Sequence, residues 1–124
     1  MLNSKTGTSK QIGDAAEDAA LDYLQQQGLQ LLQRNYRTPG RGGGEIDLIM
    51  RGRDGTLVFV EVRARVRSEF GGAAASIGAS KRRRIVRAAQ HYLLACVKLP
   101  PCRFDVVLVE PHGLQWLPAA FDAQ

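Results

Sequence analysis

The stretch that decides the fold is Gly44–Arg65, with the sequence GEIDLIMRGRDGTLVFVEVRAR. Two β-prone segments, Glu45–Met50 and Thr56–Arg65, flank Arg51–Gly55, which carries Asp-Gly turn chemistry. This pattern predicts two strands joined in a hairpin. The middle of the second segment is apolar at both alternating positions, as is typical of a central strand covered on both faces.

Two helices are predicted outside the hairpin. The first spans Ser9–Gln27, with Ser9 as the N-cap and Gly28 as the glycine that ends it. Its apolar stripe at helical spacing consists of Ile12, Ala16, Ala19, Ala20, Tyr23 and Leu24. The second spans Ser80–Val97 and is ended by the prolines that follow. Its predicted inner stripe consists of Ile85, Ala89, Tyr92, Leu93 and Cys96.

Three further strands are predicted at Leu29–Tyr36, Arg103–Val109 and, as a short fifth, Leu114–Leu117, and Ser68–Ala79 is predicted to be a loop. The element order α-β-β-β-α-β-β indicates an α/β fold: a mixed sheet of four to five strands flanked by two main helices.

Length and composition predict a single domain over residues 1–124, with residues 1–8 as a flexible N-terminal tail. The chain is 44% hydrophobic and 23% charged, which allows a core to form. No apolar run approaches the roughly 20 residues of a membrane span, and no apolar segment of a secretory signal follows Met1. Cys96 and Cys102 are too few for a disulfide framework and fit no zinc spacing. We therefore expect a cytoplasmic protein with free thiols and no membrane partner.

Two carboxylates interrupt the apolar strands of the hairpin. Asp47 lies between Ile46 and Leu48, and Glu61 lies within Val58–Val62. Carboxylates are rarely buried unless they are paired or bind a metal. The hairpin places the two strands side by side, so the acids repel and raise one another's pKa unless a cation lies between them. A divalent metal supplies such a cation, and oxygen ligands favour Mg²⁺ or Mn²⁺.

Arg63 is two residues from Glu61 and therefore projects from the same strand face. A metal ion held by Asp47 and Glu61 beside a fixed positive charge suits phosphodiester hydrolysis. The competing interpretation is structural: either acid pairs with Arg63, Arg65 or Arg37 at a sheet edge. Spacing alone favours this second interpretation, and the placement of both acids on strands makes the two about equal.

Seven segments, taken together, resemble a known family. They are GDAAE (Gly13–Glu17), RNYR (Arg34–Arg37), GEIDLI (Gly44–Ile49), FVEVRAR (Phe59–Arg65), KRRRIVRAAQHYL (Lys81–Leu93), RFDVV (Arg103–Val107) and AAF (Ala119–Phe121). Their order is that of the YraN family of small bacterial proteins. That family resembles the PD-(D/E)XK nuclease superfamily, which includes restriction endonucleases and Holliday-junction resolvases.

The resemblance implies a restriction-endonuclease-like fold and a set of site residues. Asp47 and Glu61 match the two metal-binding acids, and Glu17 matches the glutamate on a helix that often completes the site. Taken by itself, Glu17 is better explained as a solvated helix residue. The superfamily usually has lysine at the position of Arg63, and arginine stays charged, so Arg63 can stabilise charge but is a poor general base. Arg65 offers no lysine substitute.

The net charge of +5 and its distribution point to an anionic partner. Lys81, Arg82, Arg83, Arg84 and Arg87 fall in the first two turns of the second helix, with Arg83, Arg84 and Arg87 on its outer side. Arg37 and Arg65 lie on or beside the carboxylate strands. The default interpretation of an isolated basic run is a helix face exposed to solvent. The alternative is an anionic ligand, which would relieve the repulsion between the crowded cations.

The first functional hypothesis is a metal-dependent endonuclease acting on DNA, including branched or damaged structures. The second is a nucleic-acid-binding module that keeps the nuclease fold with little or no activity, because Arg63 replaces lysine. The third is a protein-interaction module whose basic helix contacts an acidic partner. A homodimer is suggested only by analogy with resolvases.

Overall fold

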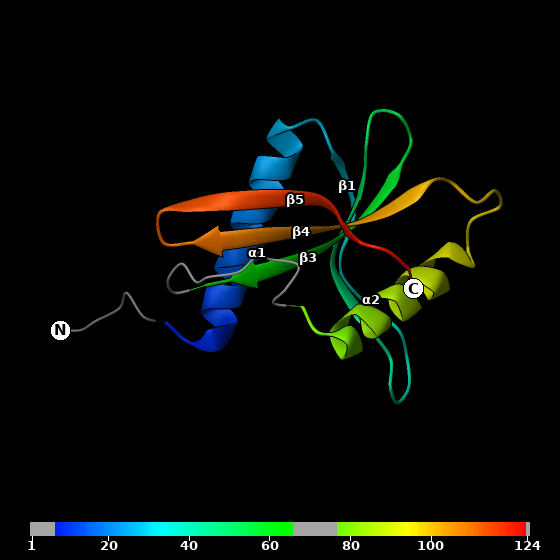
Figure 1. The fold of residues 1–124 in the computed structure, drawn as a ribbon, viewed down its shortest axis with the longest axis horizontal. Coiled ribbons are helices and arrows are strands. Elements are labelled where there is room, and N and C mark those ends of the chain that lie inside the picture. The colour runs from blue at the N-terminus through cyan, green and yellow to red at the C-terminus, as the bar shows by residue number, and fades with distance from the viewer. Residues whose placement is uncertain (1–6, 66–76, 124) are drawn as a thin grey trace.

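The computed structural model describes residues 7–65 and 77–123. Its elements are α1 (Ser9–Gln26), β1 (Gln30–Arg37), β2 (Glu45–Arg51), β3 (Leu57–Ala64), α2 (Ala79–Leu93), β4 (Cys102–Glu110) and β5 (Gly113–Phe121). This confirms the predicted α/β order. The sheet runs β1-β2-β3-β4-β5 and is mixed, because β3 and β4 are parallel while the other neighbours are antiparallel (Figure 1).

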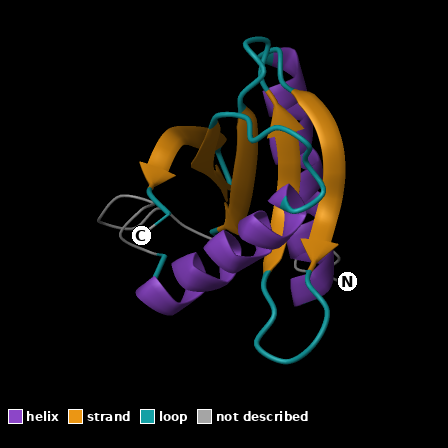
Figure 2. Ribbon diagram, turned by 90° about the vertical axis from the view of Figure 1, so that its right-hand side faces the viewer, coloured by secondary structure: helices purple, strands orange, loops and turns teal. Residues whose placement is uncertain are grey.

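The two helices cover opposite faces of the sheet (Figure 2). Ala20 and Leu24 of α1 pack against Val58 and Val60 of β3. On the other face, α2 packs against Phe59, which shows that β3 is covered on both sides as predicted. Alternate residues of this strand therefore enter two separate cores.

The start of α1 differs by one residue from the prediction. Thr8, and not Ser9, is the N-cap: Thr8 Oγ1 accepts from Gln11 N at 3.0 Å, and Gln11 Oε1 accepts from Thr8 N at 2.8 Å. This reciprocal capping box satisfies two helix-end donors, which a cap at Ser9 would not do with this glutamine. Residues 1–6 of the predicted tail lie outside the described residues.

The other end of α1 follows the predicted glycine. Gly28 has a φ of 99°, its N–H donates to Gln25 O at 3.0 Å, and Leu29 N donates to Leu24 O at 3.1 Å. These two bonds form a Schellman motif, which requires the left-handed conformation that glycine adopts easily. The predicted stripe is buried at Ala16, Ala20 and Leu24, whereas Ile12 and Ala19 are exposed.

Helix α2 is shorter than predicted. It starts at Ala79 and ends at Leu93, four residues before Val97. Beyond Leu93 the chain turns more tightly than an α-helix. The N–H groups of Leu94, Ala95 and Cys96 each donate to the carbonyl three residues earlier. Of the predicted inner stripe, Ile85 and Ala89 are buried and the later members are half-buried, whereas Leu94 and Val97 at the predicted end are exposed.

Strand β5 is longer than the short strand predicted over Leu114–Leu117. It continues through Pro118 and Ala119, although Ala119 has a φ of 50°. Proline is tolerated there because β5 is an outer strand of the described sheet, where a missing N–H breaks no further ladder. The predicted Ser68–Ala79 loop lies mainly in residues 66–76, outside the described residues. Within the described residues no helix is long and apolar enough to cross a membrane.

In β1 and β2 the regular alternation of side chains between the two faces of the sheet is interrupted near Asp47. Arg34 forms ion pairs with α1, whereas Tyr36 packs against Tyr92 of α2, although residues two apart normally share a face. Asn35 between them has a φ of 52°. On β2, Leu48 likewise packs on the α1 side and Ile46 on the α2 side. Asp47 lies at this change.

Candidate functional site

Asp47 and Glu61 are brought together where β2 and β3 separate. The recorded pairing of the two strands reaches Leu48 and Val60 and does not continue to the acids. Beyond this last pair, Val62 N of β3 donates to Asp47 Oδ2 of β2 at 2.8 Å. The Asp47 side chain thus accepts a backbone N–H that a backbone carbonyl would accept in a regular sheet. Asp47 is 9% exposed and Glu61 is 5% exposed. The predicted neighbourhood of the two acids is therefore present in the structure.

The environment of these acids opposes their ionisation. Burial, and then the charge of Glu61, raise the pKa of Asp47 to about 7, and the Val62 N–H offsets part of this effect. Burial also raises the pKa of Glu61, while the Lys81 ammonium acts in the opposite direction. Because the two carboxyls interact, the protonation of one changes the pKa of the other.

Lys81 reaches the acids from α2. Its Nζ lies 3.8 Å from Glu61 Oε2. Glu61 continues the alternation of Leu57 and Phe59, both of which face α2, so its side chain lies beneath the first turn of that helix. Glu61 Oε1 is buried, with no hydrogen-bond partner among the described residues. Sequence reasoning placed Lys81 among the phosphate-binding residues and missed this contact, because it joins residues twenty positions apart on different elements.

Glu17 approaches from α1 but is engaged by an arginine. Arg34 Nη2 lies 3.4 Å from Glu17 Oε1 and 3.0 Å from Asp18 Oδ1. Burial and the nearby Asp47 charge raise the pKa of Glu17. Across residues 7–65 and 77–123, no group of three or more His, Cys, Asp or Glu side chains is close enough to hold a metal ion. The described chain therefore offers Asp47 and Glu61 as a pair, with Glu17 near them.

Of the three arginines predicted to pair with the acids, Arg65 and Arg37 have other partners. In the described ion pairs, Arg65 Nη1 lies 3.9 Å from Glu110 Oε2, and Arg37 Nε lies 3.9 Å from Glu45 Oε1. Arg63 is half-buried, and its charge lowers the pKa of Glu61 less than that of Lys81 does. The recorded partner of Glu61 is thus a lysine on the facing helix.

The basic side of α2 lies as predicted at Arg83, Arg84 and Arg87, which are exposed. Arg84 Nε donates to Gly43 O at 3.5 Å, and Arg87 Nη1 donates to Gly42 O. These bonds join α2 to the loop before β2. Arg82, partly exposed, donates through Nε to Ile77 O at 3.0 Å.

Gly44 allows this loop to approach the helix backbone. A Cβ atom at Gly44 would lie 1.8 Å from Arg84 O, well inside any permitted contact. Only glycine fits there, and the next residues of the chain lead directly into β2 and Asp47. The contact therefore fixes the acid strand relative to the basic helix.

A third buried acid, Asp105 on β4, is not among the site residues predicted from the sequence. It is 0% exposed, and its carboxylate accepts from Arg103, from Trp116 Nε1 at 2.9 Å and from Ala119 N at 2.9 Å. Every contact is made within β4 and β5. Asp105 therefore joins the two strands and has a structural role.

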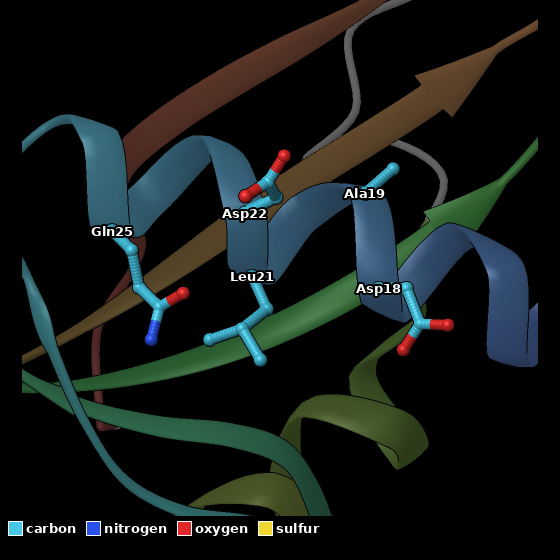
Figure 3. Close-up of a pocket in the computed structure, with 5 residues that line it drawn as sticks. All are labelled: Asp18, Ala19, Leu21, Asp22 and Gln25. Carbon is cyan, nitrogen blue, oxygen red and sulfur yellow. The ribbon is translucent and has the colours of Figure 1, made fainter.

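A depression of about 410 Å³ lies along α1, and neither strand acid lines it. Figure 3 shows the side chains that line it. Its lining residues are Asp18, Ala19, Leu21, Asp22 and Gln25. Asp18 and Asp22 are exposed one turn apart, so this surface repels phosphate groups. The acidic side of α1 and the basic side of α2 give the molecule two electrostatically different helices.

These features define a class of protein: an α/β domain with a helix on each face of a mixed sheet and a buried acid pair where two strands separate. The family described as "Uncharacterised protein family UPF0102" matches residues 16–109, and the chain belongs to it. This confirms the YraN-like assignment. The chain is 66% identical to a UPF0102 protein of Albidiferax ferrireducens over 122 residues, covering 98% of this chain and 95% of that protein. It is 69% identical to one of Paracidovorax citrulli over 116 residues, covering 94% and 86%.

Proposed function

We propose that this protein is a Mg²⁺- or Mn²⁺-dependent endonuclease that cleaves DNA, including branched or damaged structures. The observation that carries the proposal is the buried pair of Asp47 and Glu61, in which burial raises both pKa values and Glu61 Oε1 has no partner within the described residues. An acid pair kept only for stability would have its acceptor oxygens satisfied. An unsatisfied oxygen beside a second acid favours a cationic ligand.

The donor set fits a hard divalent ion. Mg²⁺ is commonly bound by one or two carboxylates, with water and substrate phosphate oxygens completing an octahedron. Asp47 and Glu61 would hold the ion, and Glu17 lies on the α1 side, where release from Arg34 would let it assist. When bound, such an ion polarises a phosphoryl oxygen and acidifies a water molecule.

The charge distribution supports a nucleic-acid substrate. Arg83, Arg84 and Arg87 form an exposed basic side that starts two residues after Lys81, which itself contacts Glu61. A phosphate backbone following α2 would therefore be led toward the acid pair. Contacts of this kind fix position without reading base sequence, which favours recognition of DNA structure.

The test is cleavage of duplex, single-stranded and four-way-junction DNA with Mg²⁺ or Mn²⁺. We expect cleavage of at least one substrate, and a loss of roughly 100-fold or more in Asp47→Asn and Glu61→Gln, because each removes a metal-binding charge. Asp22→Asn, on the exposed side of α1, is the matched control and should cleave like the wild type. Lack of cleavage by the wild type on all three substrates would refute the proposal.

A second function, DNA binding with little cleavage, is favoured by Arg63. Arginine cannot lose its proton at neutral pH, so a site that needs a lysine at this position would be inactive. If Arg63→Lys cleaves and the wild type only binds, this second function is correct. Absent or salt-insensitive DNA binding would instead favour an acidic protein partner for the basic helix. The cytoplasmic location and the homodimer stay predictions.

A further inference from the structure

Among the described residues, the cation that pairs with Glu61 comes from a different element than the superfamily pattern suggests. The pattern places a lysine on the strand, two residues after Glu61, where this chain has Arg63. In the structure Lys81 Nζ lies 3.8 Å from Glu61 Oε2. The charge of Lys81 also lowers the pKa of Glu61 more than that of Arg63 does.

The local structure holds Lys81 in this position. It lies in the first turn of α2, where its side chain is 35% exposed, so the ammonium is directed at a buried acid while still open to solvent. The preceding N-cap, Gly78, has no side chain to accept the first amides of the helix. These amides add positive partial charge on the same side as the ammonium.

We propose that Lys81 is the phosphate-binding amine of this site and takes the role that the superfamily pattern gives to a lysine at position 63. This inference rests on the proposed nuclease function. Asp47 and Glu61 would hold the metal ion, and the Lys81 ammonium, 3.8 Å from Glu61 Oε2, would then be available to an oxygen of the scissile phosphate. There it would stabilise the negative charge that develops during cleavage.

The position of Lys81 connects binding with cleavage. Its neighbours Arg83 and Arg84 belong to the exposed basic side of α2, whereas its own side chain turns inward toward Glu61. One helix therefore carries both the residues that hold the backbone and the residue that contacts the reacting phosphate. Under this arrangement Arg63 is not required to be a lysine.

The experiment compares Lys81→Met, Lys81→Arg and Arg63→Met in the full chain. Two quantities are measured: the cleavage rate with Mn²⁺, and the affinity for Mn²⁺ alone from calorimetry. Lys10→Met is the control, because Lys10 is exposed and pairs with Asp14 on α1.

We expect Lys81→Met to lower the cleavage rate by roughly 100-fold, in the range seen when one charge-stabilising donor is removed. It should bind Mn²⁺ at least as tightly as the wild type, since removing a positive charge near the acids cannot weaken metal binding electrostatically. Lys81→Arg should recover part of the rate, and Arg63→Met should lose less than Lys81→Met.

A purely structural role for Lys81 would lower metal affinity and cleavage together, and that result would overturn the inference. Wild-type cleavage by Lys81→Met would also overturn it while leaving the nuclease function intact. Failure of the wild type to cleave any substrate would instead remove the nuclease function, and this inference with it.

Discussion

Two sets of buried acids lie in the same sheet and differ in their surroundings. Asp105 on β4 receives hydrogen bonds from Arg103, Trp116 and Ala119. In the pair of Asp47 and Glu61, Asp47 accepts one backbone N–H, Glu61 Oε2 lies 3.8 Å from the Lys81 ammonium, and Glu61 Oε1 has no hydrogen-bond partner within the described part of the chain. Burial alone therefore does not distinguish the two sites, whereas the number of satisfied acceptor oxygens does.

The largest expected effect concerns the satisfied acid. Asp105→Ala leaves the Arg103 guanidinium, the Trp116 indole N–H and the Ala119 amide without their acceptor. Breaking a buried charged network of this kind costs about 3–5 kcal/mol. Urea unfolding at pH 7 should show this loss in the free energy of unfolding, and a change below about 1 kcal/mol would contradict the structural role.

The opposite sign is expected for Asp47→Asn. The pKa of Asp47 in the folded protein is about 7, against an ordinary value of 3.8, so the folded protein keeps a proton that the unfolded chain loses. The free energy of unfolding that this group contributes is present below about pH 4 and is lost as the pH rises through 7.

Asparagine can still accept from Val62 N without carrying a charge. At pH 8 Asp47→Asn should therefore be more stable than the wild type by up to about 4 kcal/mol, and at pH 4 the two should be nearly equal. Thermal unfolding across this pH range measures the difference. Equal midpoints at pH 8 would show that Asp47 is not strained by burial.

Mn²⁺ should raise the free energy of unfolding through the pair of Asp47 and Glu61. At ten times its dissociation constant, Mn²⁺ should stabilise the wild type by about 1.4 kcal/mol. Glu61→Gln should lose most of this stabilisation because it removes the unsatisfied carboxylate. An exposed-acid variant, Asp22→Asn, should retain it. Equal stabilisation of all three proteins in calorimetric scans would place the ion elsewhere.

The smallest effect is expected on the basic side of α2. Arg84→Ala should weaken DNA binding about threefold and reduce the slope of log affinity against log salt by about 0.9, the value for one phosphate contact. Gln25→Ala on α1 should change neither quantity. Fluorescence anisotropy at several salt concentrations measures both, and an unchanged slope would remove Arg84 from the DNA-binding surface.

Local patterns were sufficient for much of this protein. The hairpin between β2 and β3 was predictable because Asp-Gly turn chemistry joins two segments of strand-forming residues, and this alone made Asp47 and Glu61 neighbours. The exposed position of Arg83, Arg84 and Arg87 followed from helical periodicity. Both signals act over a few residues, which is the range that sequence patterns resolve.

The tertiary structure decided what the acids contact. Nothing local to Lys81 indicates that α2 crosses above Glu61, and nothing local to Asp105 indicates that Trp116 and Ala119 satisfy it. The change of strand face at Asn35 and Asp47 likewise depends on packing against both helices. The sequence by itself determined that Asp47 and Glu61 are buried together. The packing of distant elements decided that Asp105 is fully hydrogen-bonded and that Glu61 keeps one oxygen without a partner among the described residues.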